Sequence, residues 1–329
     1  MNKRLLGKTG FEISEISIGT WQVGGKWGTT FNNTNADAIL HAAVENGINF
    51  IDTADVYSDG DSEKAIGKFL RTRREKIYVA TKCGRQFSPH IDALYQPKAL
   101  RQYVEDSLTR LGLETLDLIQ LHCPPTATYN RPEIFDLFND LKKEGKILNM
   151  GVSVETIDEA LKAIEYDNVT TVQIIFNMLR QRPAEHFFAK AASKNVGIIV
   201  RVPLASGLLT GKFSSSSTFD KNDHRNFNRN GEAFDKGETF SGVNYEKGLA
   251  AVAAIKEVFP QVTNLSAIAL KWILMFSEVS CVIPGASSIE QVASNVSAAD
   301  IANISTEDMA KVKAIYDSLI WPDLAKEKW

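Results

Sequence analysis

The sequence predicts a closed (β/α)8 barrel, and three observations support this fold class. Strand and helix patterns alternate along the 329 residues, and no change in composition separates one strand–helix unit from the next. Such alternation is typical of a parallel sheet with right-handed crossovers, and eight units in one chain favour a barrel. The alternative, an open nucleotide-binding sheet, would carry a Gly-x-Gly-x-x-Gly motif after its first strand, where this sequence has none. We therefore expect one domain over residues 1–329.

A hairpin is predicted at the N-terminus. Two short alternating runs, residues 4–6 and 11–13, flank the turn Gly7-Lys8-Thr9-Gly10. Eight apolar runs then predict the barrel strands, in order, at residues 16–19, 49–52, 77–81, 116–121, 147–151, 171–175, 197–202 and 280–283.

Apolar residues at helical spacing predict the helices that follow these strands. Asn46-Gly47 is a typical helix end, and Pro132 is a typical helix start. The helices are expected at residues 35–45, 63–70, 97–111, 132–144, 156–164, 184–194, 247–258, 264–276, 288–296 and 306–319.

A long polar stretch, residues 214–242, separates the seventh strand from the next helix. A connection of this length is either a lid over a ligand or a solvated flexible loop. Its Arg225 and Arg229 fit a phosphate contact and a solvated surface equally well. The sequence leaves both readings open.

Composition and charge exclude several classes of protein. The net charge is −3 and no basic stripe is present, which argues against a nucleic-acid partner. No apolar run is long enough to span a bilayer, and the N-terminus lacks the apolar core of a signal peptide. The three cysteines, Cys83, Cys123 and Cys281, are an odd number without paired spacing. We therefore expect a soluble, cytoplasmic protein with no membrane partner.

Reactive side chains lie where the predicted strands end. In a (β/α)8 barrel the active site lies at the carboxyl ends of the strands. Asp52, Lys82 and His122 end three adjacent strands, and Tyr57 follows Asp52 closely enough to fold back over it. An ammonium group held by a carboxylate favours the phenolate form of a tyrosine, so the phenol becomes a better general acid. The histidine can hydrogen-bond the same substrate oxygen. This combination suits carbonyl reduction, for which a nicotinamide cofactor must supply the hydride.

The surrounding segments resemble those of the aldo-keto reductases along nearly the whole chain. The matching segments are "GTWQVGG" (19–25), "FIDTADVY" (50–57), "VATKCG" (79–84), "DLIQLHCP" (117–124), "GVS" (151–153), "VQIIFN" (172–177), "PLASGLLTGKF" (203–213) and "VIPGASSIEQVASN" (282–295). The likeness is greatest to the bacterial branch that is similar to potassium-channel β subunits. It implies an NADPH-dependent reductase of aldehydes and ketones whose catalytic residues are Asp52, Tyr57, Lys82 and His122. Trp21, Tyr57 and His122 would contact the small carbonyl substrate.

The resemblance also implies a set of cofactor contacts. Ser153 and Gln173 match positions that bind the nicotinamide amide, and Arg201 ends the strand beside the nicotinamide. The remaining positions are Thr20, Trp21 and Gln22 after the first strand, Asp52, the phosphate-binding turn with Val202, Pro203, Leu204, Ser206 and Gly207, then Lys212, and the adenosine end with Gly285, Ser287, Gln291 and Asn295.

Three positions depart from the family pattern. Val154 replaces an asparagine, so one amide contact is lost, and Arg201 replaces an aromatic residue that stacks on the nicotinamide. A guanidinium is planar and can stack, but it adds a charge. Residues 285–291 contain no Lys or Arg for a 2′-phosphate. NADPH is therefore expected to be the preferred cofactor by a modest margin, with NADH also used.

Other functions are compatible with parts of this pattern. Cys83, Cys123 and His122 together suggest a metal site, although zinc sites usually contain closely spaced cysteine pairs. Asp52 and Asp55 suggest a glycosidase, but they lie too close in sequence to flank a sugar from different strands. An NADPH-binding regulatory subunit with little turnover would keep the same four residues. Among the tryptophans, Trp21 is expected in the pocket wall and Trp27 is a core candidate.

Overall fold

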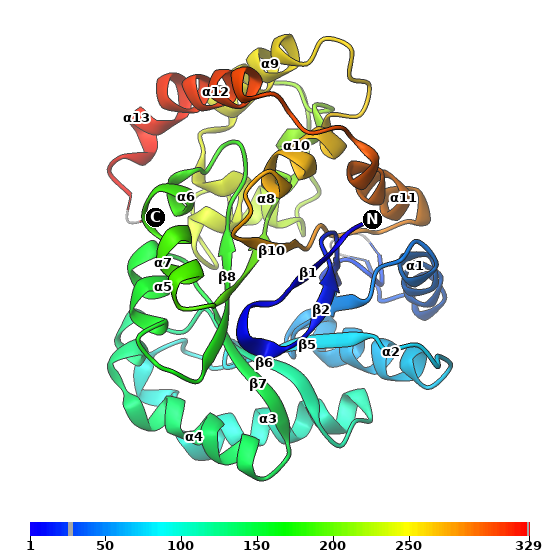
Figure 1. Ribbon diagram of the computed structural model, residues 1–329, viewed down its shortest axis with the longest axis vertical. Helices are drawn as coiled ribbons and strands as arrows, with labels where there is room; N and C mark the ends of the chain where they lie inside the picture. Colours follow the sequence, from blue (N-terminus) through cyan, green and yellow to red (C-terminus); the bar gives the residue numbers. More distant parts are fainter. Residues whose placement is uncertain (26–28, 328) are drawn as a thin grey trace.

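Eight parallel strands form a nearly closed barrel in the computed structural model, which describes residues 1–25, 29–327 and 329 (Figure 1). They are β3 (Ile18–Gly19), β4 (Phe50–Asp52), β5 (Tyr78–Cys83), β6 (Leu116–His122), β7 (Ile147–Ser153), β8 (Val169–Ile175), β9 (Gly197–Arg201) and β10 (Val279–Val282). Each strand pairs with its neighbour in sequence. The ring closes where Ser17 N donates to Val282 O over 2.9 Å and Gly19 N donates to Pro284 O over 3.1 Å. The predicted fold class is confirmed, whereas Trp27 lies outside the described residues.

Helices surround the barrel, and most begin and end close to the predicted residues. They are α1 (Asn33–Glu45), α2 (Asp61–Leu70), α3 (Pro97–Leu111), α4 (Pro132–Lys143), α5 (Ile157–Ala163), α6 (Arg182–His186), α7 (Phe188–Ser193), α8 (His224–Phe227), α9 (Tyr245–Val258), α10 (Leu265–Leu274), α11 (Ile289–Val296), α12 (Thr306–Ile315) and α13 (Trp321–Leu324). Polar caps fix several of the helix starts. Thr156 and Glu159 form a reciprocal capping box on α5, and Ser288 caps α11.

Two predicted helices are interrupted. The helix expected at residues 184–194 is divided at Phe187, which leaves the helical region with φ −120°. Phe187 and Phe188 are both buried, and the break directs these adjacent side chains inward, where a straight helix would direct them to different faces. The helix expected at residues 306–319 changes after Ile315 to a wider turn over Tyr316–Ile320 before α13.

The N-terminal hairpin closes one end of the barrel. It consists of β1 (Lys3–Leu5) and β2 (Glu12–Ser14), paired antiparallel as predicted. Leu6, Phe11 and Ile13 are buried against residues that point into the barrel interior: Phe50, Ala80, Leu118, Ile199 and Cys281. A Cβ at Gly7, where φ is +51°, would lie 2.2 Å from Gly197 N, so the hairpin and β9 pack backbone to backbone.

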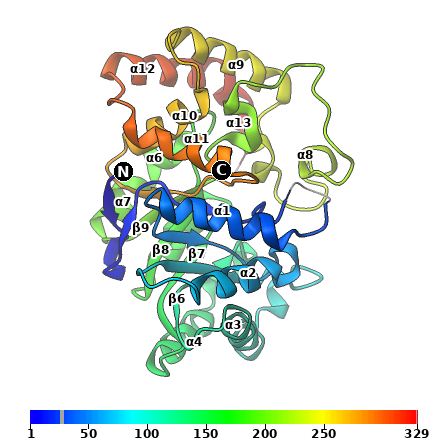
Figure 2. The same ribbon diagram turned by 90° about the vertical axis from the view of Figure 1, so that its right-hand side faces the viewer.

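Arg4 ties this hairpin to the connection between α10 and β10. Its guanidinium donates to the carbonyl oxygens of Leu274 (2.7 Å), Val279 (2.9 Å) and Phe276 (3.2 Å). In Figure 2 the hairpin lies on the left of the barrel and α8 on the right, so the hairpin and the α8 segment cover opposite ends.

Residues 214–242 fold over the carboxyl ends of the strands. Ser206 Oγ donates to Glu238 O over 3.1 Å and accepts from Phe240 N over 3.0 Å. Asn177, just after β8, donates to Ser241 Oγ over 2.7 Å. These bonds attach the end of the segment to the barrel mouth, and the segment contains the short helix α8.

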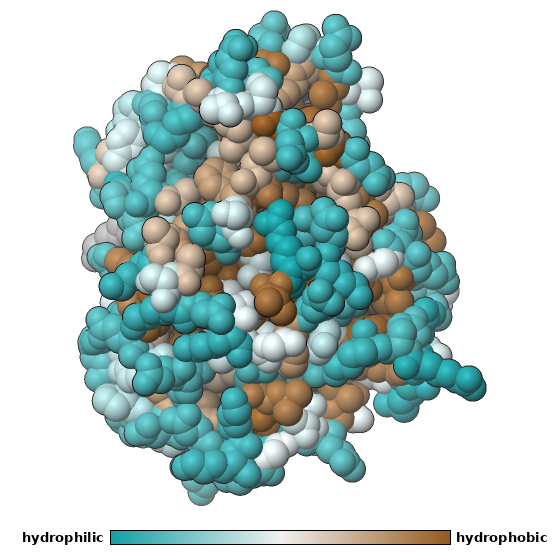
Figure 3. Space-filling view, viewed as in Figure 1, coloured by the Kyte–Doolittle hydropathy of each residue, from teal (hydrophilic) through white to brown (hydrophobic). Residues whose placement is uncertain are grey.

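The outer surface is mixed in character. On the face viewed in Figure 3, which includes the hairpin, apolar residues are scattered among polar ones. Within the described ranges, no helix combines the length and the apolar composition needed to cross a bilayer.

Candidate active site

A cleft of about 560 Å³ lies at the carboxyl ends of the barrel strands. It extends from Tyr57 and His122 to the first turn of α11, and the segment 214–242 forms part of its wall. The lining includes these predicted site residues: Thr20, Trp21, Gln22, Asp52, Tyr57, His122, Gln173, Arg201, Val202, Pro203, Leu204, Ser206, Gly207, Lys212, Gly285, Gln291 and Asn295. An elongated cleft of this kind suits a long ligand with a small substrate at one end.

The structure brings the four predicted catalytic residues together. Asp52 ends β4, Lys82 lies in β5, His122 ends β6, and Tyr57 begins a turn after β4. Lys82 Nζ donates to Asp52 Oδ2 over 2.6 Å, to Thr53 O over 2.8 Å and to Tyr57 Oη over 3.2 Å. The ring centroids of Tyr57 and His122 are 6.1 Å apart. Three acceptors thus fix the ammonium group of Lys82 directly behind the phenol.

Two side-chain amides donate hydrogen bonds to the Asp52 carboxylate. Gln173 Nε2 donates to Asp52 Oδ1 over 2.7 Å, and Gln120 Nε2 donates to the same oxygen over 3.3 Å. Asp52 is buried, so these bonds and the Lys82 ion pair replace the water that a carboxylate needs. Gln173, expected to bind the nicotinamide amide, therefore uses its amide nitrogen to orient Asp52. Gln120 was not anticipated from the sequence.

For both the Tyr57 phenol and the Lys82 ammonium group, burial and their mutual attraction shift the pKa in opposite directions. Burial raises the pKa of Tyr57 above its usual value, and the Lys82 charge offsets only part of that rise. Burial lowers the pKa of Lys82, but attraction to Asp52 and Tyr57 outweighs it, so the net shift is upward. Lys82 therefore stays charged. Its effect on the phenol has the expected direction, but it does not bring the phenol pKa below the usual value.

His122 is uncharged in this environment. Burial lowers the pKa of His122 well below its usual value, and the charges of Arg85, Lys82 and Arg201 add to that effect. Its Nδ1 is buried without a hydrogen-bond partner among the described residues. A neutral imidazole beside the phenol can hydrogen-bond a substrate oxygen without competing for its proton.

The residues after β3 line the cleft next to the phenol. Thr20 Oγ1 donates to Asp52 O over 3.0 Å, so its hydroxyl supports the strand end. The Trp21 ring stacks on Tyr57 with centroids 5.9 Å apart and meets Phe234 at 6.2 Å. Trp21 therefore lies in the pocket wall, and Gln22 lines the cleft nearby.

A strained turn follows β9. Val202, Ala205 and Ser206 all have positive φ, near +50°, and Gly207 has φ +98°. Such non-glycine conformations persist only where the surroundings hold them, and they often mark ligand sites. Ser206 lines the cleft, yet its hydroxyl already bonds Glu238 O and Phe240 N. A ligand would meet this turn mainly through its backbone.

The far end of the cleft is formed by the start of α11. Gly285, Gln291 and Asn295 line it, and a Cβ at Gly285 would meet no atom closer than 3.8 Å, so this backbone is open to a ligand. Ser287 does not line the cleft, and its N–H donates to Gln291 Oε1 over 2.7 Å. The helix N-terminus adds a positive partial charge.

Ser153 also lies outside the cleft lining. Its hydroxyl is 3.5 Å from Cys123 Sγ, and both side chains are buried behind the mouth. Cys83 packs in the core between strands and helices. Among the described residues, metal-ligand spacing is found for Cys123, Glu155 and Glu238, and not for the combination of Cys83, Cys123 and His122.

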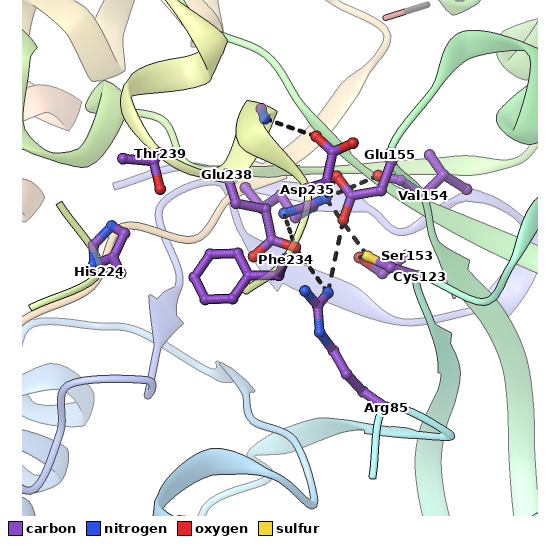
Figure 4. A network of polar contacts seen from close by, with 12 residues as sticks. Arg85, Cys123, Ser153, Val154, Glu155, His224, Phe234, Asp235, Glu238 and Thr239 are labelled. Carbon is purple, nitrogen blue, oxygen red and sulfur yellow. Dashed lines mark hydrogen bonds and ion pairs between the residues drawn. The ribbon is translucent and has the colours of Figure 1, made fainter. Parts of the chain in front are cut away.

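A buried network of two arginines and two glutamates adjoins the catalytic residues. Arg85 Nη1 lies 2.7 Å from Glu238 Oε1 and 3.7 Å from Glu155 Oε1. Arg201 Nη2 donates to Glu155 Oε2 over 2.8 Å and to Val154 O over 3.0 Å. Figure 4 shows Arg85 pointing toward both carboxyl groups, with Phe234 beside them. Because guanidinium groups already neutralise these carboxylates, the network disfavours a bound cation.

Sequence reasoning missed three members of this network. Arg85 and Glu155 each lie two residues beyond a strand end, so a search of strand ends for opposite charges would have found them. Glu238 belongs to segment 214–242, whose path over the barrel is not encoded by periodicity. Burial raises the pKa of Glu238, and the neighbouring Glu155 adds to that effect, despite the attraction of Arg85.

Asp55 does not line the cleft, which removes the carboxylate pair of the glycosidase reading. Its side chain is buried, and neither carboxyl oxygen has a hydrogen-bond partner within the described part of the chain. Burial and the charge of Glu63 raise the pKa of Asp55 to about 7.

A (β/α)8 barrel with this group of residues at its mouth defines a class of oxidoreductase. The chain belongs to the aldo-keto reductase family, whose model matches residues 15–317. It is 30% identical over 346 aligned residues to the NADH-specific methylglyoxal reductase of Escherichia coli, covering 97% of this chain and 99% of that protein. The resemblance seen in the sequence is confirmed.

Solved structures agree with this assignment. The glycerol dehydrogenase of Gluconobacter oxydans superposes with a TM-score of 0.80 at 29% identity, over 97% of this chain and 96% of that chain. The holo form of an aldo-keto reductase from Bacillus halodurans gives a TM-score of 0.77 at 27% identity, over 96% of each chain.

Proposed function

We propose that this protein reduces aldehyde or ketone carbonyls to alcohols, with Tyr57 as the general acid and NADPH as the preferred cofactor. The observation that supports this most directly is the chain from Asp52 through Lys82 to the Tyr57 hydroxyl, which opens into the cleft beside His122. Residues 1–329 would act as one domain, and the partner is a small carbonyl compound.

The protein residues have separate roles in the proton half of the reaction. Tyr57 and the neutral His122 both hydrogen-bond the carbonyl oxygen and orient it. As the oxygen develops negative charge, the Tyr57 hydroxyl transfers its proton to it. Lys82 stabilises the phenolate that remains, and Asp52 keeps the ammonium group in position. A bound nicotinamide supplies the hydride that the carbonyl carbon receives.

The cleft fits a dinucleotide of this kind. The planar Arg201 side chain would lie beside the nicotinamide, with its charge balanced by Glu155. The turn at residues 202–207 would bind the phosphates through backbone N–H groups, and Lys212 would add a positive charge. Gly285 and Asn295 would face the adenosine, with the N-terminus of α11 next to them.

The preference for NADPH is expected to be modest. Residues 285–291 contain no basic side chain, so hydroxyl and backbone groups would hold a 2′-phosphate without a guanidinium. The relative from Escherichia coli is named as NADH-specific, which supports use of NADH by this chain as well.

A panel of aldehydes and ketones with NADPH and with NADH, followed by nicotinamide absorbance, tests the proposal. Tyr57→Phe should lose turnover with every substrate, whereas Tyr103→Phe, outside the cleft, serves as the matched control. Cofactor binding without turnover on any carbonyl would instead favour a regulatory NADPH-binding subunit.

A further inference from the structure

The carbonyl site is enclosed by a wall of aromatic rings that ends in a charged pair. Trp21 meets Tyr57 on one side and Phe234 on the other. The Arg85 guanidinium lies over the Phe234 ring, 5.5 Å from its centroid, and forms the ion pair with Glu238. Arg85 and Glu238 both line the cleft, together with Tyr57 and His122. The wall limits substrate size, and the pair supplies polar groups that the proposed proton transfer does not use.

This pair offers a hydrogen-bond donor and an acceptor next to each other. A guanidinium has five N–H groups in a fixed fork, and Arg85 uses Nη1 for its two carboxylate contacts. The Arg85 side chain is 19% exposed, within the cleft. A hydroxyl group both donates and accepts, so it matches such a pair better than a methyl or a carbonyl does.

Among the residues that the structure describes, the full charges next to the carbonyl site are paired. Lys82 pairs with Asp52, Arg201 with Glu155 and Arg85 with Glu238. A carboxylate or phosphate on the carbon beside the carbonyl would therefore find no unpaired cation among these described groups and would meet Glu238. This pairing of charges favours an uncharged polar substituent on that carbon.

We propose that Arg85 and Glu238 form a subsite for a hydroxyl group on the carbon next to the reacting carbonyl. The preferred substrates are then small, uncharged 2-hydroxyaldehydes and hydroxyketones. This inference rests on the carbonyl-reductase function proposed above and adds a substrate class and two specificity-determining residues to it.

Glycolaldehyde and propanal form the test pair, because they differ by a hydroxyl in place of a methyl group. The wild type should have the higher kcat/KM for glycolaldehyde, and Arg85→Met should lower the glycolaldehyde-to-propanal ratio by about tenfold or more. Arg85→Lys keeps the charge but loses the planar fork, so its glycolaldehyde-to-propanal ratio should lie between those of the wild type and Arg85→Met. Arg101→Met removes an exposed arginine that pairs with Glu144 on the outer surface and should keep the wild-type ratio.

The ratio is compared within each enzyme, so a general loss of activity and the hydration of glycolaldehyde both cancel. A ratio in Arg85→Met or Arg85→Lys within twofold of wild type would overturn the subsite. It would leave Arg85 as a structural anchor for segment 214–242.

A second measurement tests the charge balance. Glu238→Gln removes the nearer of the two carboxylates beside Arg85 and leaves only the contact with Glu155 at 3.7 Å, so the relative kcat/KM for glyoxylate over glycolaldehyde should rise about tenfold. An unchanged glyoxylate preference contradicts the inference, provided that the cofactor dissociation constant shows an intact cleft.

The outcomes separate this inference from the proposed function. A wild type that reduces glycolaldehyde and propanal equally well refutes the subsite while supporting carbonyl reduction. A wild type that binds NADPH but reduces neither refutes both.

Discussion

Replacing Asp55 by asparagine should change how the stability of the protein depends on pH. The Asp55 carboxyl is buried without hydrogen-bond partners in the described residues, and its pKa is raised from 3.8 to about 7 by burial and by Glu63. Arg110 and Lys82 act in the opposite direction but do not cancel the rise. The folded protein therefore keeps this proton at a pH where the unfolded chain has lost it.

The sign and the size of the effect follow from this difference. Because the pKa is higher in the folded state, the stability contributed by Asp55 is complete below pH 3.8 and is lost as pH rises toward about 7. At about 1.4 kcal/mol for each pH unit, raising the pH from 5 to 8 removes about 3 kcal/mol from the free energy of unfolding. Asparagine does not titrate. The free energy of unfolding of Asp55→Asn, relative to that of the wild type, should therefore increase by about 3 kcal/mol over this interval, equivalent to about 4 °C in Tm for a chain of this size.

Urea unfolding at pH 5, 6, 7 and 8, followed by far-UV circular dichroism, measures this difference directly. The prediction concerns the change with pH, so a constant loss caused by the buried amide does not affect it. Asp136→Asn, an exposed substitution on α4, is the matched control. If the difference between Asp55→Asn and wild type is the same at all four pH values, the raised pKa of Asp55 is wrong.

Three further predictions concern the catalytic residues and the cofactor. Tyr57→Phe should lower kcat at least about a hundredfold while the cofactor dissociation constant stays within a few fold, and substantial turnover of an unactivated aldehyde would contradict the acid role. Lys82→Met should move the pH–rate profile of any residual activity to higher pH, because the phenol loses its ammonium partner; an unshifted profile would contradict this. The same substitution should destabilise the fold by about 3–5 kcal/mol in urea unfolding, because Asp52 is left as a buried carboxylate without a cationic partner. Fluorescence quenching should show NADPH bound about tenfold more tightly than NADH, about 1.4 kcal/mol, and Ser287→Arg should widen the gap; tighter binding of NADH by the wild type would refute the preference.

The proximity of the candidate catalytic residues could be predicted because barrel topology fixes where strand ends meet. Asp52, Lys82 and His122 each lie at or next to a strand end, so locating three strands was enough to bring them together. The reactions of a carboxylate, an ammonium group and a phenol then indicated the chemistry. Their pKa values were not predictable in the same way, because the rise for Tyr57 depends on how completely the site is buried.

The remaining differences arise from tertiary packing. The break at Phe187 serves the burial of two adjacent aromatic side chains, which helical spacing alone does not reveal. Ser287 lies outside the cleft lining, and its N–H donates to Gln291, which is part of that lining. Glu238 reaches Arg85 only because hydrogen bonds from Ser206 and Asn177 hold segment 214–242 over the mouth.

The N-terminal hairpin is synthesised long before the segments that it packs against. It is synthesised before the barrel strands, but the Arg4 guanidinium donates its hydrogen bonds to carbonyl groups about 270 residues later in the sequence. At roughly 5–20 residues per second, those partners emerge roughly 15–50 s after the hairpin does. Until then Leu6 and Phe11 have no β9 or β10 to cover them, so they remain available to chaperones and proteases. The end of the barrel that the hairpin closes, although encoded before the barrel strands, is completed only after β10 has been synthesised.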